Sequence, residues 1–131
     1  MGRRVLITGI GVDMVLVRRM DRWGKVPGLL ERYFHPRELA DALARGRGAS
    51  LSLAARFAAK EAFGKALGTG LAGIALKDIM VVNNEKGRPE IRVYGTALAA
   101  LDASGATRAH LSMTHEGDNA VAMVVLESPE G

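Results

Sequence analysis

Two acidic residues and one lysine carry the clearest chemical signal in this sequence. Glu61 and Lys65 stand four residues apart in the run KEAFGK, so on a helix they share one face. Such a pair is commonly an ordinary surface ion pair, but the neighbouring Phe57 and Gly64 favour partial burial, and a buried carboxylate needs a partner. Asp13 is the one charged residue in an apolar run and is our candidate for that second carboxylate. Two carboxylates with open positions are typical of Mg²⁺, which completes its shell with water and substrate phosphates.

The residues around this pair could hold phosphate groups. Arg56 and Lys60 belong to the same predicted helix and, with Lys65, would supply positive charge. Backbone N–H donors could come from a turn formed by Gly68, Thr69 and Gly70. The sequence contains neither a Walker motif nor a dinucleotide fingerprint. The residues alone therefore predict a phosphate-binding, metal-dependent site.

Two candidate residues have purely structural alternatives. Asp13 could cap a helix that begins near Val15 by accepting a backbone N–H. His115 follows the run SMT and precedes Glu116, and a single histidine is more often structural than catalytic. For both Asp13 and His115, a structural role and a functional role stay open. The spacing establishes no Ser-His-Asp arrangement.

A second group of charged residues is basic. In the segment VRRMDRWGK, helical spacing puts Arg18, Arg22 and Lys25 on one face, and Arg19 lies beside them. Faces of this kind are often only solvated. A basic face next to an exposed methionine or tryptophan, however, also suits docking of an acidic helix from a partner protein.

Strands and helices must bring these residues together. β-branched and apolar runs predict strands, the first of them buried, at 5–17, 78–83, 90–94, 110–115 and 120–126. Helical patterns occur at 15–23, 29–34, 36–46, 51–67 (capped by Ser50) and 96–104. This order predicts an α+β fold with an antiparallel sheet and helices packed on it.

The predicted helix at 51–67 carries apolar residues all round. Its alanine-rich side would allow close packing on the core, while Leu53, Phe57 and Leu67 alternate with charged residues on the opposite arc. A surface helix would separate the two kinds of residue. We therefore expect this helix to be covered on both sides, with its charges facing a ligand or a neighbouring subunit.

Composition and charge narrow the classes of protein. With 131 residues, 48% of them apolar and 24% charged, residues 1–131 are expected to form a single domain. The absence of cysteine excludes disulfides, thiolate metal ligands and a thiol nucleophile. Neither a targeting segment nor a membrane span is evident, which favours the cytoplasm. Positions 1–65 hold 13 basic and 6 acidic residues and positions 66–131 hold 5 and 8, so the net charges are +7 and −3. The basic first half predicts an acidic or phosphorylated partner.

Four segments taken together resemble the holo-acyl-carrier-protein synthase family of 4′-phosphopantetheinyl transferases. They are GIGVDMVLVRRM at 9–20, ARFAAKEAFGKALGTG at 55–70, NEKGRP at 84–89 and SMTHEGDNAVA at 112–122. The resemblance implies the fold of that family and transfer of the 4′-phosphopantetheine arm of coenzyme A to a serine of apo-acyl carrier protein. The products would be holo-acyl carrier protein, for fatty acid biosynthesis, and adenosine 3′,5′-bisphosphate.

The same resemblance implies roles for individual residues. Asp13 and Glu61 would bind Mg²⁺, and Lys65 would stabilise charge on the departing bisphosphate. Coenzyme A would contact Arg56, Lys60, Lys65, Gly68, Thr69, Gly70, Pro89 and His115. The carrier protein would dock on Arg18, Arg19, Arg22 and Lys25. Proteins of this type are typically homotrimers with active sites between subunits; the general base and the preferred carrier stay open.

Two other classes of function are compatible with parts of the sequence. A nucleic-acid-binding module is favoured by the isoelectric point of about 9.9 and by the arginine-rich segment. Only 5% of the residues are aromatic, however, and no stacking platform or known binding motif is present. A non-catalytic trimeric binding protein would need neither Mg²⁺ nor the two carboxylates.

Overall fold

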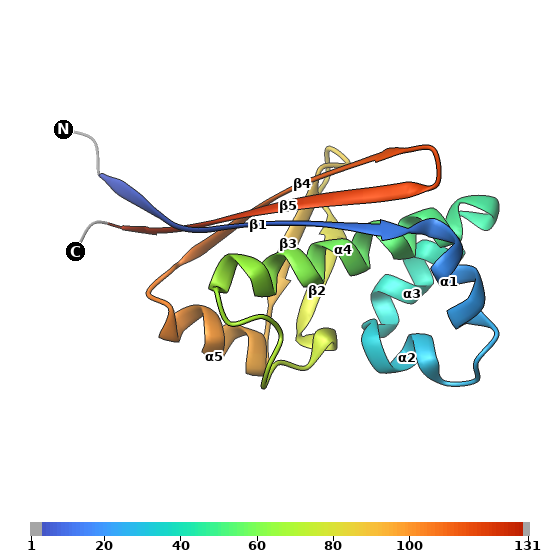
Figure 1. Ribbon diagram of the computed structural model, residues 1–131, viewed down its shortest axis with the longest axis horizontal. Helices are drawn as coiled ribbons and strands as arrows, with labels where there is room; N and C mark the ends of the chain where they lie inside the picture. Colours follow the sequence, from blue (N-terminus) through green and yellow to red (C-terminus); the bar gives the residue numbers. More distant parts are fainter. Residues whose placement is uncertain (1–3, 130–131) are drawn as a thin grey trace.

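The computed structural model describes residues 4–129, which form two antiparallel sheets and five α-helices (Figure 1). The larger sheet has the strand order β1-β5-β4 and consists of β1 (Val5–Leu16), β4 (Arg108–Glu116) and β5 (Asn119–Pro129). The smaller sheet is the hairpin of β2 (Ile79–Asn83) and β3 (Pro89–Val93). The α+β prediction is confirmed, although the strands form two sheets where one was expected.

The helices lie on one side of the larger sheet (Figure 1). The long helix α4 (Ala49–Leu67) runs along β1 and β5, and it contacts α1, α3 and β2 as well. This arrangement confirms that α4 is covered on both sides. The remaining helices are α1 (Val17–Gly24), α2 (Leu29–Tyr33), α3 (Pro36–Leu43) and α5 (Gly95–Ala103). Short 3-10 turns occur at Gly46–Gly48 and Leu76–Asp78. Within residues 4–129 we find no helix that combines the length and the apolar character needed to cross a membrane.

Two glycines allow β1 to lie directly against α4. A Cβ atom at Gly9 would lie 1.8 Å from the carbonyl oxygen of Ala66, and one at Gly11 would lie 2.0 Å from that of Ala62. Both distances are far shorter than any real contact, so only glycine fits here. The next residue on the same face of β1 is Asp13, and the glycines therefore bring its carboxylate close to α4.

The helix ends differ from the sequence predictions at two places. Asp13 lies inside β1, and the N-cap position of α1 is taken by Leu16, so the capping role considered for Asp13 is wrong. Ser50 is also not a cap, because α4 begins at Ala49, two residues earlier than predicted, with Gly48 at its N-cap. The Ser50 hydroxyl instead donates a hydrogen bond to Asp21 of α1 and ties the two helices together.

On β1 and β5 the outer face of the larger sheet is apolar, and nothing within residues 4–129 covers it. Ile10, Val12 and Met14 are 62%, 55% and 61% exposed. Their cross-strand partners on β5 are Val125, Met123 and Val121. The first strand is therefore buried on the α4 side only, which corrects the prediction of a fully buried strand. A continuous apolar patch of this kind is typical of an interface.

Candidate active site

The two predicted carboxylates lie where β1 passes α4, and Lys65 bridges the two elements. The Lys65 ammonium donates to Asp13 Oδ1 at 2.9 Å and to the Val12 carbonyl oxygen at 3.2 Å. The Asp13 side chain is 19% exposed and that of Lys65 is 54% exposed. The anticipated i, i+4 ion pair with Glu61 does not form; Lys65 instead joins the helix to the strand.

Glu61 is half-buried beside these two residues. Partial burial raises its pKa above the ordinary value, and the negative charge of Asp13 raises the pKa further. The positive charges of Lys65 and Arg19 oppose this shift. The two carboxylates therefore interact electrostatically, and a bound cation would relieve their repulsion.

This donor set fits Mg²⁺. Asp13 and Glu61 offer carboxylate oxygens from two different elements. Within residues 4–129, His, Asp and Glu side chains form no cluster of three or more that could hold a metal ion. Mg²⁺ is commonly held by one or two carboxylates together with water and substrate phosphates, so a pair suffices.

In the metal-free protein we expect Glu61 to titrate above pH 4.5 because its pKa is raised by burial and by Asp13. A raised pKa means that the ionised carboxylate destabilises the folded chain at pH values above that pKa, and the cost disappears as the pH falls through it. Carboxyl ¹³C NMR measures the pKa directly. The Asp13→Asn variant should lower it towards 4.5, and an unchanged value would contradict the electrostatic coupling.

A cavity of about 430 Å³ opens between α4, the β2–β3 hairpin and β4. It brings together three of the predicted coenzyme A contacts: Arg56, Pro89 and His115. Arg45, from the connection between α3 and α4, also lines the cavity and was not predicted. The basic run RGRG, which contains Arg45, could have pointed to this residue, but the same run is also typical of a helix end.

Arg56 lines this cavity and is held by hydrogen bonds on two of its guanidinium nitrogens. The residue is only 2% exposed; its Nε donates to Ser52 Oγ at 3.1 Å and its Nη1 donates to the Val81 carbonyl oxygen. Burial lowers its pKa, while the charges of Glu38 and Asp41 raise it. Nη2 has no hydrogen-bond partner within residues 4–129, where no buried side-chain nitrogen or oxygen lacks one. Nη2 is therefore not completely enclosed by protein, and Arg56 is one of the residues that line the cavity.

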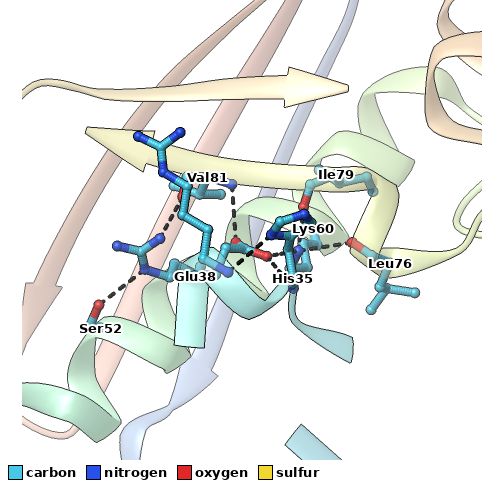
Figure 2. A network of polar contacts seen from close by, with 9 residues as sticks. His35, Glu38, Ser52, Lys60, Leu76, Ile79 and Val81 are labelled. Carbon is cyan, nitrogen blue, oxygen red and sulfur yellow. Dashed lines mark hydrogen bonds and ion pairs between the residues drawn. The ribbon is translucent and has the colours of Figure 1, made fainter. Parts of the chain in front are cut away.

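Lys60 does not reach the cavity, and its predicted contact with coenzyme A is wrong for this reason. Its ammonium is fully buried and donates to Glu38 Oε1 at 2.7 Å, to the Leu76 carbonyl oxygen at 2.9 Å and to that of Ile79 (Figure 2). These acceptors use all three of its donors. Burial lowers the Lys60 pKa, and Glu38 opposes that shift.

The turn after α4 also offers fewer free backbone N–H groups for phosphate binding than predicted. The Gly68 N–H donates to the Lys65 carbonyl oxygen and the Gly70 N–H to that of Gly64, both at 3.0 Å. These bonds close the end of the helix, so neither glycine offers a free N–H to a phosphate. The Thr69 hydroxyl donates to the Gly70 carbonyl oxygen at 3.3 Å.

The basic segment forms α1, with Lys25 at its C-cap. Arg18 lies 3.6 Å from Asp118, and both side chains are well exposed. The hydrophobic neighbours are not exposed docking residues, since Met20 is 1% exposed and Trp23 packs edge-on against Phe57 at 4.9 Å. The positive charge of Arg19 opposes the rise in the Glu61 pKa, so α1 lies beside the acidic pair, and Met20 and Trp23 pack against the core.

In this α+β fold a carboxylate pair lies beside a lysine, and a cavity lined in part by Arg45 and Arg56 lies along the same helix. The family model of the 4′-phosphopantetheinyl transferase superfamily (ACPS) matches residues 9–124. The chain belongs to this superfamily, and the resemblance seen in its motifs is confirmed.

Individual relatives are similar to this chain over nearly its whole length. A holo-[acyl-carrier-protein] synthase of Treponema denticola is 54% identical over 122 residues, which cover 93% of this chain and 99% of that protein. The crystal structure of holo-[acyl-carrier-protein] synthase from Neisseria meningitidis is similar with a TM-score of 0.80 at 38% identity, covering 92% of this chain and 98% of the other. A Bacillus anthracis holo-(acyl-carrier-protein) synthase in complex with CoA (3′,5′-ADP) has a TM-score of 0.77 at 34% identity, covering 93% and 97%.

Proposed function

We propose that this chain, acting as a single domain in the cytoplasm, is a holo-acyl-carrier-protein synthase. It transfers 4′-phosphopantetheine from coenzyme A to a serine of the apo-acyl carrier protein of fatty acid biosynthesis and releases adenosine 3′,5′-bisphosphate. The observation that carries the proposal is the coupled carboxylate pair of Asp13 and Glu61 beside Lys65, in a member of this superfamily.

The transfer forms a bond from the serine oxygen to phosphorus and breaks the bond from phosphorus to the bisphosphate oxygen, and the serine hydroxyl proton is released in net to solvent. Asp13 and Glu61 would hold Mg²⁺, which when bound neutralises charge on the pyrophosphate. Lys65 is 54% exposed and can turn its ammonium from Asp13 towards the departing bisphosphate, whose growing negative charge it would stabilise. In-line attack requires little covalent work from the protein, so positioning and charge supply most of the catalysis.

The charges behind the cavity favour an anionic ligand. Within residues 4–129 the buried charged side chains are Glu38, Arg56 and Lys60, whose charges sum to +1. Since Glu38 is paired with Lys60, the unmatched charge belongs to Arg56, on the cavity wall. A buried charge is stabilised by an ionic partner. We therefore assign the nucleotide phosphates of coenzyme A to this cavity, with Pro89 and His115 as further contacts.

Two features favour a homotrimer with active sites between subunits. The apolar outer face of β1 and β5 needs a cover that residues 4–129 of one chain do not provide. Arg56 and Glu61 are five residues apart, which separates them by about 140° around α4, so the cavity and the acidic pair open on different sides of the helix. A site that joins both is naturally completed by a second subunit.

Val12→Asp is expected to convert this trimer to monomers, because the new carboxylate would be buried without a partner at the centre of the interface. Light scattering during size-exclusion chromatography measures the mass against the 13.9 kDa of one chain. Glu31→Asp, a change at an exposed position of α2, serves as the control and should leave the mass unchanged. A wild-type protein that runs as a monomer, or a Val12→Asp trimer, would contradict the assembly.

Arg18→Glu is expected to raise the KM for the carrier protein at least tenfold and to leave the KM for coenzyme A within twofold. The α1 face would lose a positive charge and gain a negative one against an acidic partner. The variant should fold normally, since the exposed ion pair with Asp118 contributes little. Lys77→Glu makes the same charge change at an exposed site outside α1. Equal changes in both KM values for Arg18→Glu would reject α1 as the docking face.

The proposed function is tested by incubation of the protein with apo-acyl carrier protein, coenzyme A and Mg²⁺. Mass spectrometry should show addition of one phosphopantetheine group to the carrier. The reaction without Mg²⁺, with a chelator present, should show none. Absence of any mass gain across several apo-carriers would reject the proposed activity.

A further inference from the structure

Three charged side chains are enclosed together where α3, α4 and β2 meet. Glu38 and Lys60 are 0% exposed and Arg56 is 2% exposed. Figure 2 shows the Glu38 carboxylate at the centre of this group, between Lys60 of α4 and Val81 of β2. A buried carboxylate of this kind must find hydrogen-bond donors, and its partners show which parts of the fold it fixes.

Both oxygens of Glu38 accept hydrogen bonds. Oε1 accepts from the His35 N–H at 3.0 Å and from Lys60 Nζ at 2.7 Å. Oε2 accepts from the Val81 N–H at 3.0 Å. A glutamine at this position could not replace it, because in either orientation its NH₂ group would face a donor.

The backbone of Val81 links Glu38 to the cavity. Its N–H donates to Glu38, and its carbonyl oxygen accepts from Arg56 Nη1. Val81 and Arg56 both line the cavity. The backbone of this one residue thus connects a carboxylate outside the cavity wall with the guanidinium of Arg56.

We propose that Glu38 is a positioning residue for coenzyme A. It fixes the backbone of Val81, whose carbonyl oxygen holds Arg56 against the cavity, and it balances Lys60 so that the charge of Arg56 is left for the phosphates. This proposal rests on the proposed function, which supplies the ligand. It assigns to Glu38 an effect on affinity for the nucleotide, distinct from any effect on folding.

A thermodynamic cycle separates positioning from direct contact. Glu38→Gln and Arg56→Lys should each weaken binding of adenosine 3′,5′-bisphosphate about tenfold by isothermal titration calorimetry. The double variant should be no weaker than the poorer single variant, because both changes remove the same oriented guanidinium. In kinetics, the KM for coenzyme A should rise in the same proportion, while kcat and the KM for the carrier protein stay within threefold.

Asp41→Asn is the matched control. Asp41 is an exposed carboxylate on the same helix and influences Arg56 only through its charge. Its removal should leave bisphosphate affinity within twofold of the wild type. A loss as large as that of Glu38→Gln would overturn the proposal, since charge alone would then explain the effect.

A second variant keeps the test valid if Glu38→Gln fails to fold. Replacing Glu38 and Lys60 together by methionine removes both buried charges at similar volume, a change that proteins often tolerate. This variant should fold and still lose about tenfold in bisphosphate affinity, because the Val81 N–H has lost its acceptor.

The two proposals fail in different ways. Wild-type protein that transfers no phosphopantetheine rejects the proposed function. If the wild-type protein does transfer phosphopantetheine, two results would reject only the role of Glu38. One is a folded Glu38 variant with unchanged affinity for the bisphosphate. The other is a double variant in which the losses of the two single variants add.

Discussion

Glu61→Gln is expected to lower kcat about 10³-fold or more at saturating coenzyme A and Mg²⁺. The substitution would remove one of the two carboxylates proposed to hold the metal ion. Loss of the metal would remove several kcal/mol of transition-state stabilisation. Steady-state transfer to apo-acyl carrier protein measures the loss. Asp13→Asn should show a similar defect, and the double variant should be little worse than either, because both residues act as one unit.

The fold should survive this substitution. The Glu61 pKa is raised by burial and by Asp13, so the ionised side chain destabilises the metal-free protein at neutral pH. A neutral glutamine removes that cost, and the Tm of the metal-free variant should equal or exceed that of the wild type. Glu31→Gln, an exposed change on α2, should leave both kcat and Tm unchanged. Undiminished turnover of Glu61→Gln would eliminate the proposed metal site.

Local sequence patterns were sufficient to predict the strand and the helix that position Asp13 and Glu61. Apolar residues all round the 51–67 segment predicted a helix covered on both sides, and α4 is packed between the larger sheet and the elements α1, α3 and β2. The lone charge of Asp13 in an apolar strand predicted a residue that needs a partner, and the structure supplies Lys65. Helical and strand periods are local properties, which is why the sequence shows them.

Pairings between distant segments were not predictable in the same way. Lys60 and Lys65 look alike in the run KEAFGK, yet Lys60 is buried against Glu38, 22 residues away, while Lys65 reaches β1. Lysine is seldom fully buried without a partner, and the partner belongs to another helix. No spacing within α4 distinguishes the two lysines. The choice between phosphate contact and buried ion pair is made by tertiary structure.

The first strand shows a related limit of prediction from sequence. Its residues are apolar on both faces, which indicates cover on both sides without saying what provides it. Within the chain α4 covers one face, where Gly11 and Val15 are buried, and Val12 on the other face remains 55% exposed. A strand that meets a neighbouring subunit has the same sequence pattern as one buried inside a single domain.

Gly11→Ala is expected to reduce both stability and activity, because the added methyl group would lie 2.0 Å from the Ala62 carbonyl oxygen. A backbone atom cannot move aside as a side chain can, so β1 must shift away from α4. Overpacking of this kind costs about 3 kcal/mol, which corresponds to a Tm about 10 °C lower for a domain of this size. Thermal unfolding followed by circular dichroism measures the change.

The same shift should damage catalysis even in the molecules that remain folded. Asp13 follows Gly11 on the same face of β1, and a displacement of about 1 Å can cost roughly 100-fold in rate. Assays well below the Tm of the variant separate this loss from unfolding. Gly24→Ala is the matched control, since its new methyl group would meet only a Leu30 side-chain atom at 3.9 Å. If Gly11→Ala retained wild-type kcat, the close approach of β1 to α4 would not be what sets the geometry of the carboxylate pair.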